Sequence, residues 1–83
     1  MKYVMIKSNN FETPFVFPDT ETHSDVAKRL NHNLEHVVSA GFCNHGVREN
    51  GEVEWACWGK SISLNIDSRG DVDTAIMNSM FRR

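Results

Sequence analysis

The sequence predicts a small α+β domain in which an antiparallel β-sheet packs against two helices. Two observations predict it: apolar and polar side chains alternate around turn signals between residues 43 and 66, and two other segments have the spacing of amphipathic helices. The expected order of elements is β-β-α-β-β-β-α, with about five strands in one domain over residues 1–83. We expect both helices on the apolar face of the sheet and water on the other face.

The first turn of the central hairpin is predicted at residues 49–51, "ENG". A three-residue hairpin loop favours glycine in its left-handed position, which Gly51 supplies. This turn places Val47 opposite Val53 and Cys43 opposite Cys57. The strand that enters the turn is expected to begin with "VVSAGF".

A second turn is predicted at Gly59–Lys60, a two-residue loop with glycine first. It would pair Trp58 with Ser61 and bring a third strand beside the second. Both turns agree on one apolar face, and a slip of one residue would destroy that agreement. The apolar face would hold Cys43, His45, Val47, Val53, Trp55, Cys57, Ile62, Leu64 and Ile66.

The segments before this meander predict a hairpin and a helix. Residues 2–7 and 14–18 are rich in β-forming side chains, and the polar stretch 8–13 between them is expected to be a wide loop. Thr22 and Asp25 have the spacing of a helix-capping box, which predicts a helix over 22–30.

A second helix is predicted over residues 71–81, with acidic side chains in its first turn. Apolar or small residues recur at helical spacing and would face the sheet. Met77 and Phe81 lie beside this stripe and would form an apolar patch of their own. The stripe consists of Val72, Ala75, Ile76, Ser79 and Met80.

Composition excludes some classes of protein. The net charge of −2 is too small to attract phosphate backbones strongly or to imitate DNA. No segment is typical of a signal peptide or a membrane span, so we expect no membrane partner. Two cysteines without a secretory signal indicate reduced thiols and a cytoplasmic protein.

The histidines and cysteines raise the questions of a metal site and of a catalytic pair. His32 and His36 are four residues apart, and Cys43 and His45 form a C-x-H pair, but no C-x₂-C motif is present. Cys57 or Cys43 with His45 as base would lack an orienting third residue and an oxyanion loop. We therefore predict no catalytic residue, no cofactor and no metal, and we leave open whether His32, His36 or His45 binds a metal.

Partner-binding residues are predicted on the polar face of the sheet. Phe42 and Trp58 would be cross-strand neighbours there, beside the charged residues Arg48, Glu54 and Lys60. Tryptophan, aromatic and arginine side chains anchor protein interfaces, and an exposed aromatic pair is costly unless it is used. The 8–13 loop or a second subunit of a homodimer could instead cover the two aromatics.

Several stretches resemble small uncharacterised proteins encoded by phages, prophages and bacterial accessory regions. They are "KYVMIK", "FPDTETHSDVAKRL", "VVSAGF" and "WACWGKSISLNIDSR". The resemblance spans most of the chain but transfers no catalytic residue. It implies a context, because small phage proteins often bind and disable a host protein, including defence nucleases.

The hypothesis that follows is a non-enzymatic binding protein, encoded by a phage or mobile element, that inhibits a host (defence) protein in the host cytoplasm. The alternative is a small nucleic-acid-binding module, because base-stacking sheets also display aromatic side chains. The basic half of that pattern is weak, since Glu52 and Glu54 accompany Arg48 and Lys60.

Overall fold

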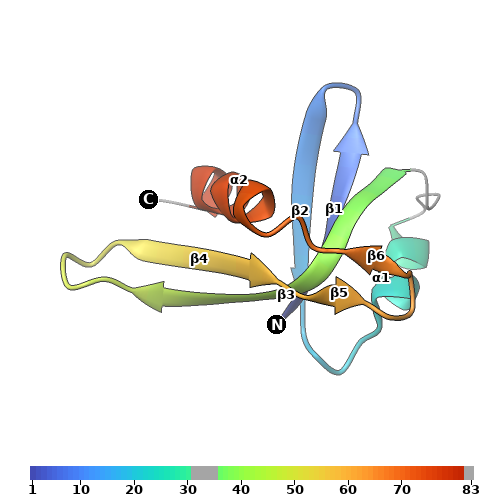
Figure 1. Cartoon of the computed structure of the whole chain (residues 1–83), viewed down its shortest axis with the longest axis horizontal. Helices are drawn as coiled ribbons and strands as arrows, with labels where there is room; N and C mark the ends of the chain where they lie inside the picture. Colours follow the sequence, from blue (N-terminus) through green and yellow to red (C-terminus); the bar gives the residue numbers. More distant parts are fainter. Residues whose placement is uncertain (31–35, 82–83) are drawn as a thin grey trace.

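The computed structural model describes residues 1–30 and 36–81, and these ranges contain six strands and two helices (Figure 1). This confirms the α+β class and the antiparallel sheet, with one more short strand than expected. No helix in the described ranges is long and apolar enough to cross a membrane. The elements are β1 (Lys2–Ser8), β2 (Phe11–Phe17), α1 (His23–Arg29), β3 (Val37–Val47), β4 (Val53–Trp58), β5 (Lys60–Ser61), β6 (Ile66–Asp67) and α2 (Asp71–Phe81).

The main sheet has the strand order β2-β1-β3-β4, with every neighbouring pair antiparallel. Tyr3, Val4, Met5 and Ile6 of β1 are all almost completely buried, although successive side chains of a strand point to opposite faces. Both faces of the sheet are therefore covered. The prediction of both helices on one face is wrong, because Val4 and Ile6 pack with α1 whereas Tyr3 and Met5 pack with α2.

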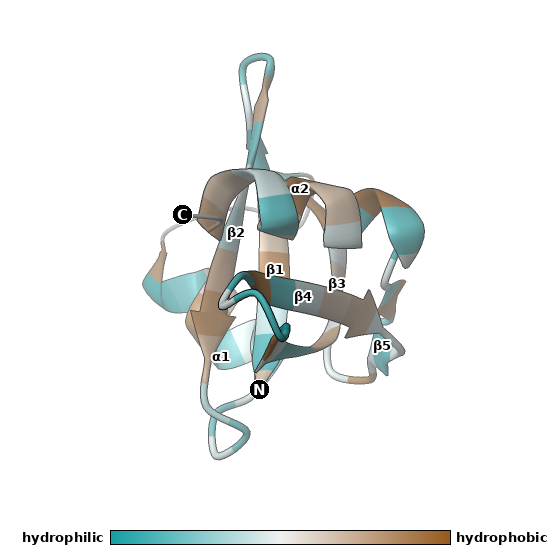
Figure 2. Cartoon of the chain, turned by 90° about the vertical axis from the view of Figure 1, so that its left-hand side faces the viewer, coloured by the Kyte–Doolittle hydropathy of each residue, from teal (hydrophilic) through white to brown (hydrophobic). Residues whose placement is uncertain are grey.

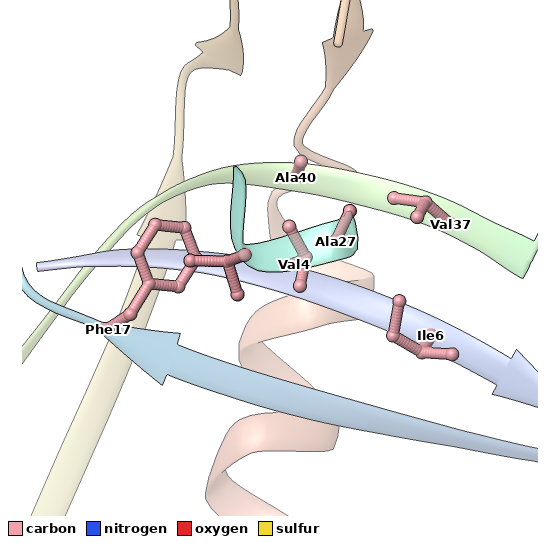
Figure 3. Close-up of a cluster of buried hydrophobic side chains, with 7 residues drawn as sticks. Val4, Ile6, Phe17, Ala27, Val37 and Ala40 are labelled. Atoms are coloured by element: carbon pink, nitrogen blue, oxygen red, sulfur yellow. The ribbon is translucent and has the colours of Figure 1, made fainter. Parts of the chain in front are cut away.

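Helix α1 covers one face through a short apolar contact (Figure 3). Its start is the predicted one, since the Asp25 backbone N–H donates to the Thr22 hydroxyl at 3.1 Å. Val26 and Ala27 then pack against Val4 and the neighbouring side chains of the sheet. Because α1 has only seven residues, it covers part of this face and leaves the rest to other elements.

Helix α2 covers the opposite face with a different stripe from the predicted one. Met77 is fully buried among Tyr3, Met5 and the two cysteines, so it belongs to the core and not to a surface patch. Val72 and Met80, which were expected to face the sheet, are 51% and 50% exposed. The helix therefore turns the face that carries Met77 toward the sheet. The other buried residue on this face is an acid, Asp73.

Asp73 is buried because a network of hydrogen bonds satisfies it. The Tyr3 hydroxyl donates to its carboxylate at 2.5 Å, and the Arg69 backbone N–H and guanidinium donate at 3.0 and 2.9 Å. Burial alone would raise the pKa of Asp73, but these hydrogen bonds and the Arg69 charge lower it below the usual value. Arg69 also pairs with Glu12 of β2, which ties the start of α2 to the sheet.

The central hairpin of β3 and β4 has the predicted register. Cys43 lies opposite Cys57, and Val47 lies opposite Val53. Gly51 has φ = 86° in the connecting turn, as a left-handed loop position requires. Beyond Lys2, the first residue of β1, the two strands continue as a ribbon that projects from the body of the molecule (Figure 1). Val47, near its tip, is exposed, so its predicted burial is wrong.

The predicted third strand of the meander does not form. Residues 60–61 pair with residues 66–67 in a separate two-stranded sheet, so Trp58 does not pair with Ser61. Side chains of α2 occupy the edge of β4 instead. The Asn78 carboxamide accepts from the Trp55 N–H at 2.7 Å and donates to the Trp55 carbonyl at 3.2 Å, and the Cys57 N–H donates to the Thr74 hydroxyl at 2.9 Å.

The hairpin of β1 and β2 is tighter than predicted. Only Asn9 and Asn10 separate the strands, with Asn9 at φ = 57°, so the wide loop over 8–13 is wrong. This turn lies at the opposite end of β1 from Lys2, which is the register partner of Phe42. The 8–13 segment is therefore not the cover of Phe42 and Trp58.

Candidate functional site

Trp58 is the last residue of β4 and points away from α2. Its register partner is Phe42, as predicted, and the pair lies on the face of the sheet that α1 covers further along. The expectation of a face without helices is therefore wrong, because His23, the first residue of α1, lies edge-on to the Phe42 ring. The Trp58 side chain nevertheless remains 48% exposed, whereas Cys57 beside it is buried under α2.

Gly59 directs the chain from Trp58 into β5. It has φ = 81°, which a glycine adopts at little cost. A Cβ atom at this position would lie 3.0 Å from the Phe42 ring, so glycine also allows the backbone to pass close to that ring. This close approach holds Phe42 against the start of β5 and places Lys60 beside Trp58.

The turn after β5 presents Ile62 to solvent. The buried Ser61 hydroxyl accepts from the Leu64 N–H at 3.1 Å, and the Ser63 hydroxyl accepts from the Ser24 N–H of α1 at 3.2 Å. Ile62 itself is 88% exposed, so its predicted place in the core is wrong. The sequence-based assignment missed this residue because the preceding Gly59–Lys60 turn was expected to begin a buried strand.

These elements enclose a shallow depression of ≈ 570 Å³, which we call the Trp58 pocket. The aromatic rings of Trp58 and Phe42 and the side chain of Ile62 supply its apolar surface. Lysines contribute its charge, and among the described residues no acidic side chain lines it. We define the pocket by Lys2, His23, Phe42, Trp58, Lys60 and Ile62.

His23 is the buried polar residue of the pocket. Its Nε2–H donates to the Gly41 carbonyl at 2.8 Å, and its ring lies edge-on to Phe17 and Phe42. Burial lowers the pKa of His23, and the nearby Lys2 charge acts in the same direction. His23 is therefore neutral at neutral pH, contacts the Phe42 ring and adds no charge to the pocket. No sequence motif indicated this role of His23.

Arg48 and Glu54 lie apart from this pocket on the β3–β4 ribbon. The guanidinium of Arg48 donates to the carboxylate of Glu54 at 2.9 and 2.6 Å. Both line a second depression of ≈ 470 Å³, to which Trp58 also contributes. Of the predicted site residues, the fold thus brings together Phe42, Trp58 and Lys60 in the Trp58 pocket. Arg48 and Glu54 instead form an ion pair with each other in the second depression.

The cysteines have the properties of core residues. Both thiols are free and buried, and burial raises the pKa of Cys43 and of Cys57 to about 11. An activated nucleophile needs the opposite shift. His45, the base of the candidate Cys–His pair in the sequence, stacks on Trp55 with ring centroids 4.8 Å apart.

A metal site is not seen in the described ranges, which contain no group of three or more His, Cys, Asp or Glu side chains suited to a metal ion. His36 is exposed directly before β3. His32, the other histidine of the predicted pair, lies outside the described residues.

The second predicted patch, Met77 with Phe81, is not a surface patch. Met77 is in the core, and the Phe81 ring packs on Trp55 with centroids 5.4 Å apart. The large apolar residues of α2 that are exposed are Val72 (51%), Met80 (50%) and, to a smaller extent, Phe81 (38%). Met80 lines a groove between α2 and β2 together with Phe11, on the other side of the molecule's sheet from α1.

No family model, curated protein or solved structure matches this chain. The function must therefore be inferred from the geometry of the Trp58 pocket and from the chemistry of the side chains that line it. The most informative features of the pocket are its exposed apolar side chains and the two lysines beside them.

Proposed function

We propose that this chain is a non-enzymatic protein-binding module and that the Trp58 pocket is its contact surface. The observation that carries the proposal is the joint exposure of Ile62 (88%) and Trp58 (48%) beside one depression. Large apolar side chains grouped in this way commonly mark interaction sites, and tryptophan is enriched among the residues that dominate binding energy.

The rigid presentation of these side chains supports the proposal. Hydrogen bonds from Leu64 to Ser61 and from Ser24 to Ser63 fix the turn that carries Ile62. A contact surface that is ordered before binding loses less conformational entropy when a partner docks. Ile62, exposed on a preformed turn, can therefore bind a partner with little loss of conformational entropy.

The resemblance to phage-encoded proteins supports a narrower proposal about context. In it, the chain is an accessory protein of a phage or mobile element that binds and inhibits a host protein in the host cytoplasm. The two buried free thiols suit a reducing compartment. A second copy of the chain is the competing occupant of the pocket, and it would give a homodimer.

Capture from a host lysate tests the proposal when variants accompany the native protein. We expect Trp58→Ala and Ile62→Ser to lose the same captured protein, because both side chains line the pocket. Val72→Ser is the matched control, since Val72 is exposed and apolar but lies on α2. Sedimentation of the native protein distinguishes a host partner from a second copy.

Capture that all three variants retain equally would contradict the proposed surface. Loss by Val72→Ser alone would move the contact to α2. Only a protein that is lost with both pocket variants and retained by the control counts as support.

Nucleic-acid binding is the second candidate, and the placement of Lys2 and Lys60 beside the two aromatic rings favours it. Bases stack on exposed aromatic side chains while lysines contact phosphates. Binding of that kind weakens steeply as salt concentration rises, whereas an interface anchored by apolar side chains weakens far less, because few of its contacts are ionic. A titration at two salt concentrations therefore separates the two candidates.

A further inference from the structure

The charge around the Trp58 pocket has one sign. Lys2 and Lys60 line it, and no carboxylate from residues 1–30 or 36–81 does. The Lys2 ammonium donates to the Glu21 backbone carbonyl at 3.0 Å, which holds its charge at the rim. Lys60 lies at the start of β5, directly after the turn at Gly59.

The neighbouring acidic side chains leave these lysines unneutralised. Asp19 pairs with the N-terminal ammonium, and Glu21 pairs with Arg29. Asp67 is the cross-strand neighbour of Lys60, but no ion pair joins them within residues 1–30 and 36–81. Two lysines without carboxylate partners thus border an apolar depression, in a chain whose net charge is −2.

We infer that the partner segment bound by the Trp58 pocket carries a large apolar side chain with carboxylates on either side of it. The inference rests on the proposed function and specifies its partner. The apolar side chain would contact Trp58, Phe42 and Ile62, and the carboxylates would approach Lys2 and Lys60. Complementary charge of this kind orients a partner and rejects segments of the wrong sign.

An acidic peptide fits the pocket better than a nucleic acid does. Ile62 provides an aliphatic wall, which suits a leucine or phenylalanine side chain. In the part of the chain that the structure describes, two lysines are the cations that border the pocket, and Arg48 of the ribbon is bound to Glu54. A phosphate backbone requires a longer positive track than this.

Titrations with four defined probes test the inference, with the assigned indole resonance of Trp58 as the readout. Three peptides share a central Leu-Phe pair, which is flanked on both sides by Glu, by Ser or by Lys. The fourth probe is a single-stranded thymidine 10-mer. We expect the Glu peptide to bind about ten-fold more tightly than the Ser peptide, and the Lys peptide to bind most weakly, since a pair of favourable charges contributes on this scale at an interface.

The double variant Lys2→Gln/Lys60→Gln tests whether the two lysines cause this preference. We expect it to bind the Glu and Ser peptides equally and to retain the native affinity for the Ser peptide. Lys28→Gln is the matched control, because Lys28 is an exposed lysine of α1 that does not line the pocket. It should keep the native ten-fold preference.

Equal binding of the three peptides, or binding of none, would overturn the inference. In either case the capture experiment would still decide the proposed protein-binding function, because it does not depend on the charge of the partner. Tighter binding of the thymidine 10-mer than of the Glu peptide, lost in the double lysine variant, would also overturn it and would assign the pocket to nucleic acid.

Discussion

The two tryptophans of β4 lie on opposite faces of the same strand and have opposite surroundings. Trp55 packs against the α2 side of the core, stacks on His45 and contacts Phe81. Trp58 projects from the other face, where it lines an open pocket together with His23, the first residue of α1. The comparison shows that exposure of an aromatic residue here depends on how fully a helix covers its face of the sheet, and not on the alternation of the strand.

The two edges of the sheet differ in a related way. Helix α2 lies alongside β4 (Figure 2), and its Asn78 and Thr74 side chains satisfy backbone groups that a fifth strand would use. At the other edge, β2 carries Pro14, which lacks the N–H needed to pair with another strand. One helix therefore covers Trp55 and also closes the neighbouring edge.

Trp55→Ala should cause the largest loss of stability. We expect the free energy of unfolding to fall by ~3–5 kcal/mol, because truncation of this large, partly buried aromatic removes its packing against the core, His45 and Phe81. Urea denaturation followed by circular dichroism measures this loss. A loss below ~1 kcal/mol would show that α2 does not cover this side chain.

Asn78→Ala should have an intermediate effect. It removes two hydrogen bonds to the Trp55 backbone and leaves an N–H and a C=O group unpaired, so we expect a loss of ~1–3 kcal/mol. Ser79→Ala, at an exposed position of the same helix, is the control and should change stability by less than ~0.5 kcal/mol. Equal effects of the two substitutions would exclude a role of Asn78 at the β4 edge.

Local signals in the sequence were sufficient for the central hairpin and for the start of α1. The Gly51 turn fixed the pairing of Cys43 with Cys57, and Thr22 marked the helix cap. These features depend on residues close together in the chain, so a single sequence reveals them.

Features that depend on distant contacts were not predicted. The unbroken apolar run from Tyr3 to Ile6 indicates a strand that is buried on both faces. This run was the sequence feature from which helices on opposite faces of the sheet could have been predicted. The use of Asn78 at the β4 edge has no local signature, and the missing third strand follows from it. Ile62 was predicted to lie in the core because this third strand was expected, so the sequence-based prediction found only part of the candidate site.

Trp58→Ala should have the smallest effect on stability and a large effect on binding. Its side chain is 48% exposed, so we expect a loss of about 1 kcal/mol or less in the free energy of unfolding. Partner affinity should fall by ~2 kcal/mol or more, the scale of an interface anchor. Denaturation and a binding titration on the same preparation measure both quantities. A variant that fails to fold would make Trp58 a core residue, and a folded variant that binds normally would place the contact surface elsewhere.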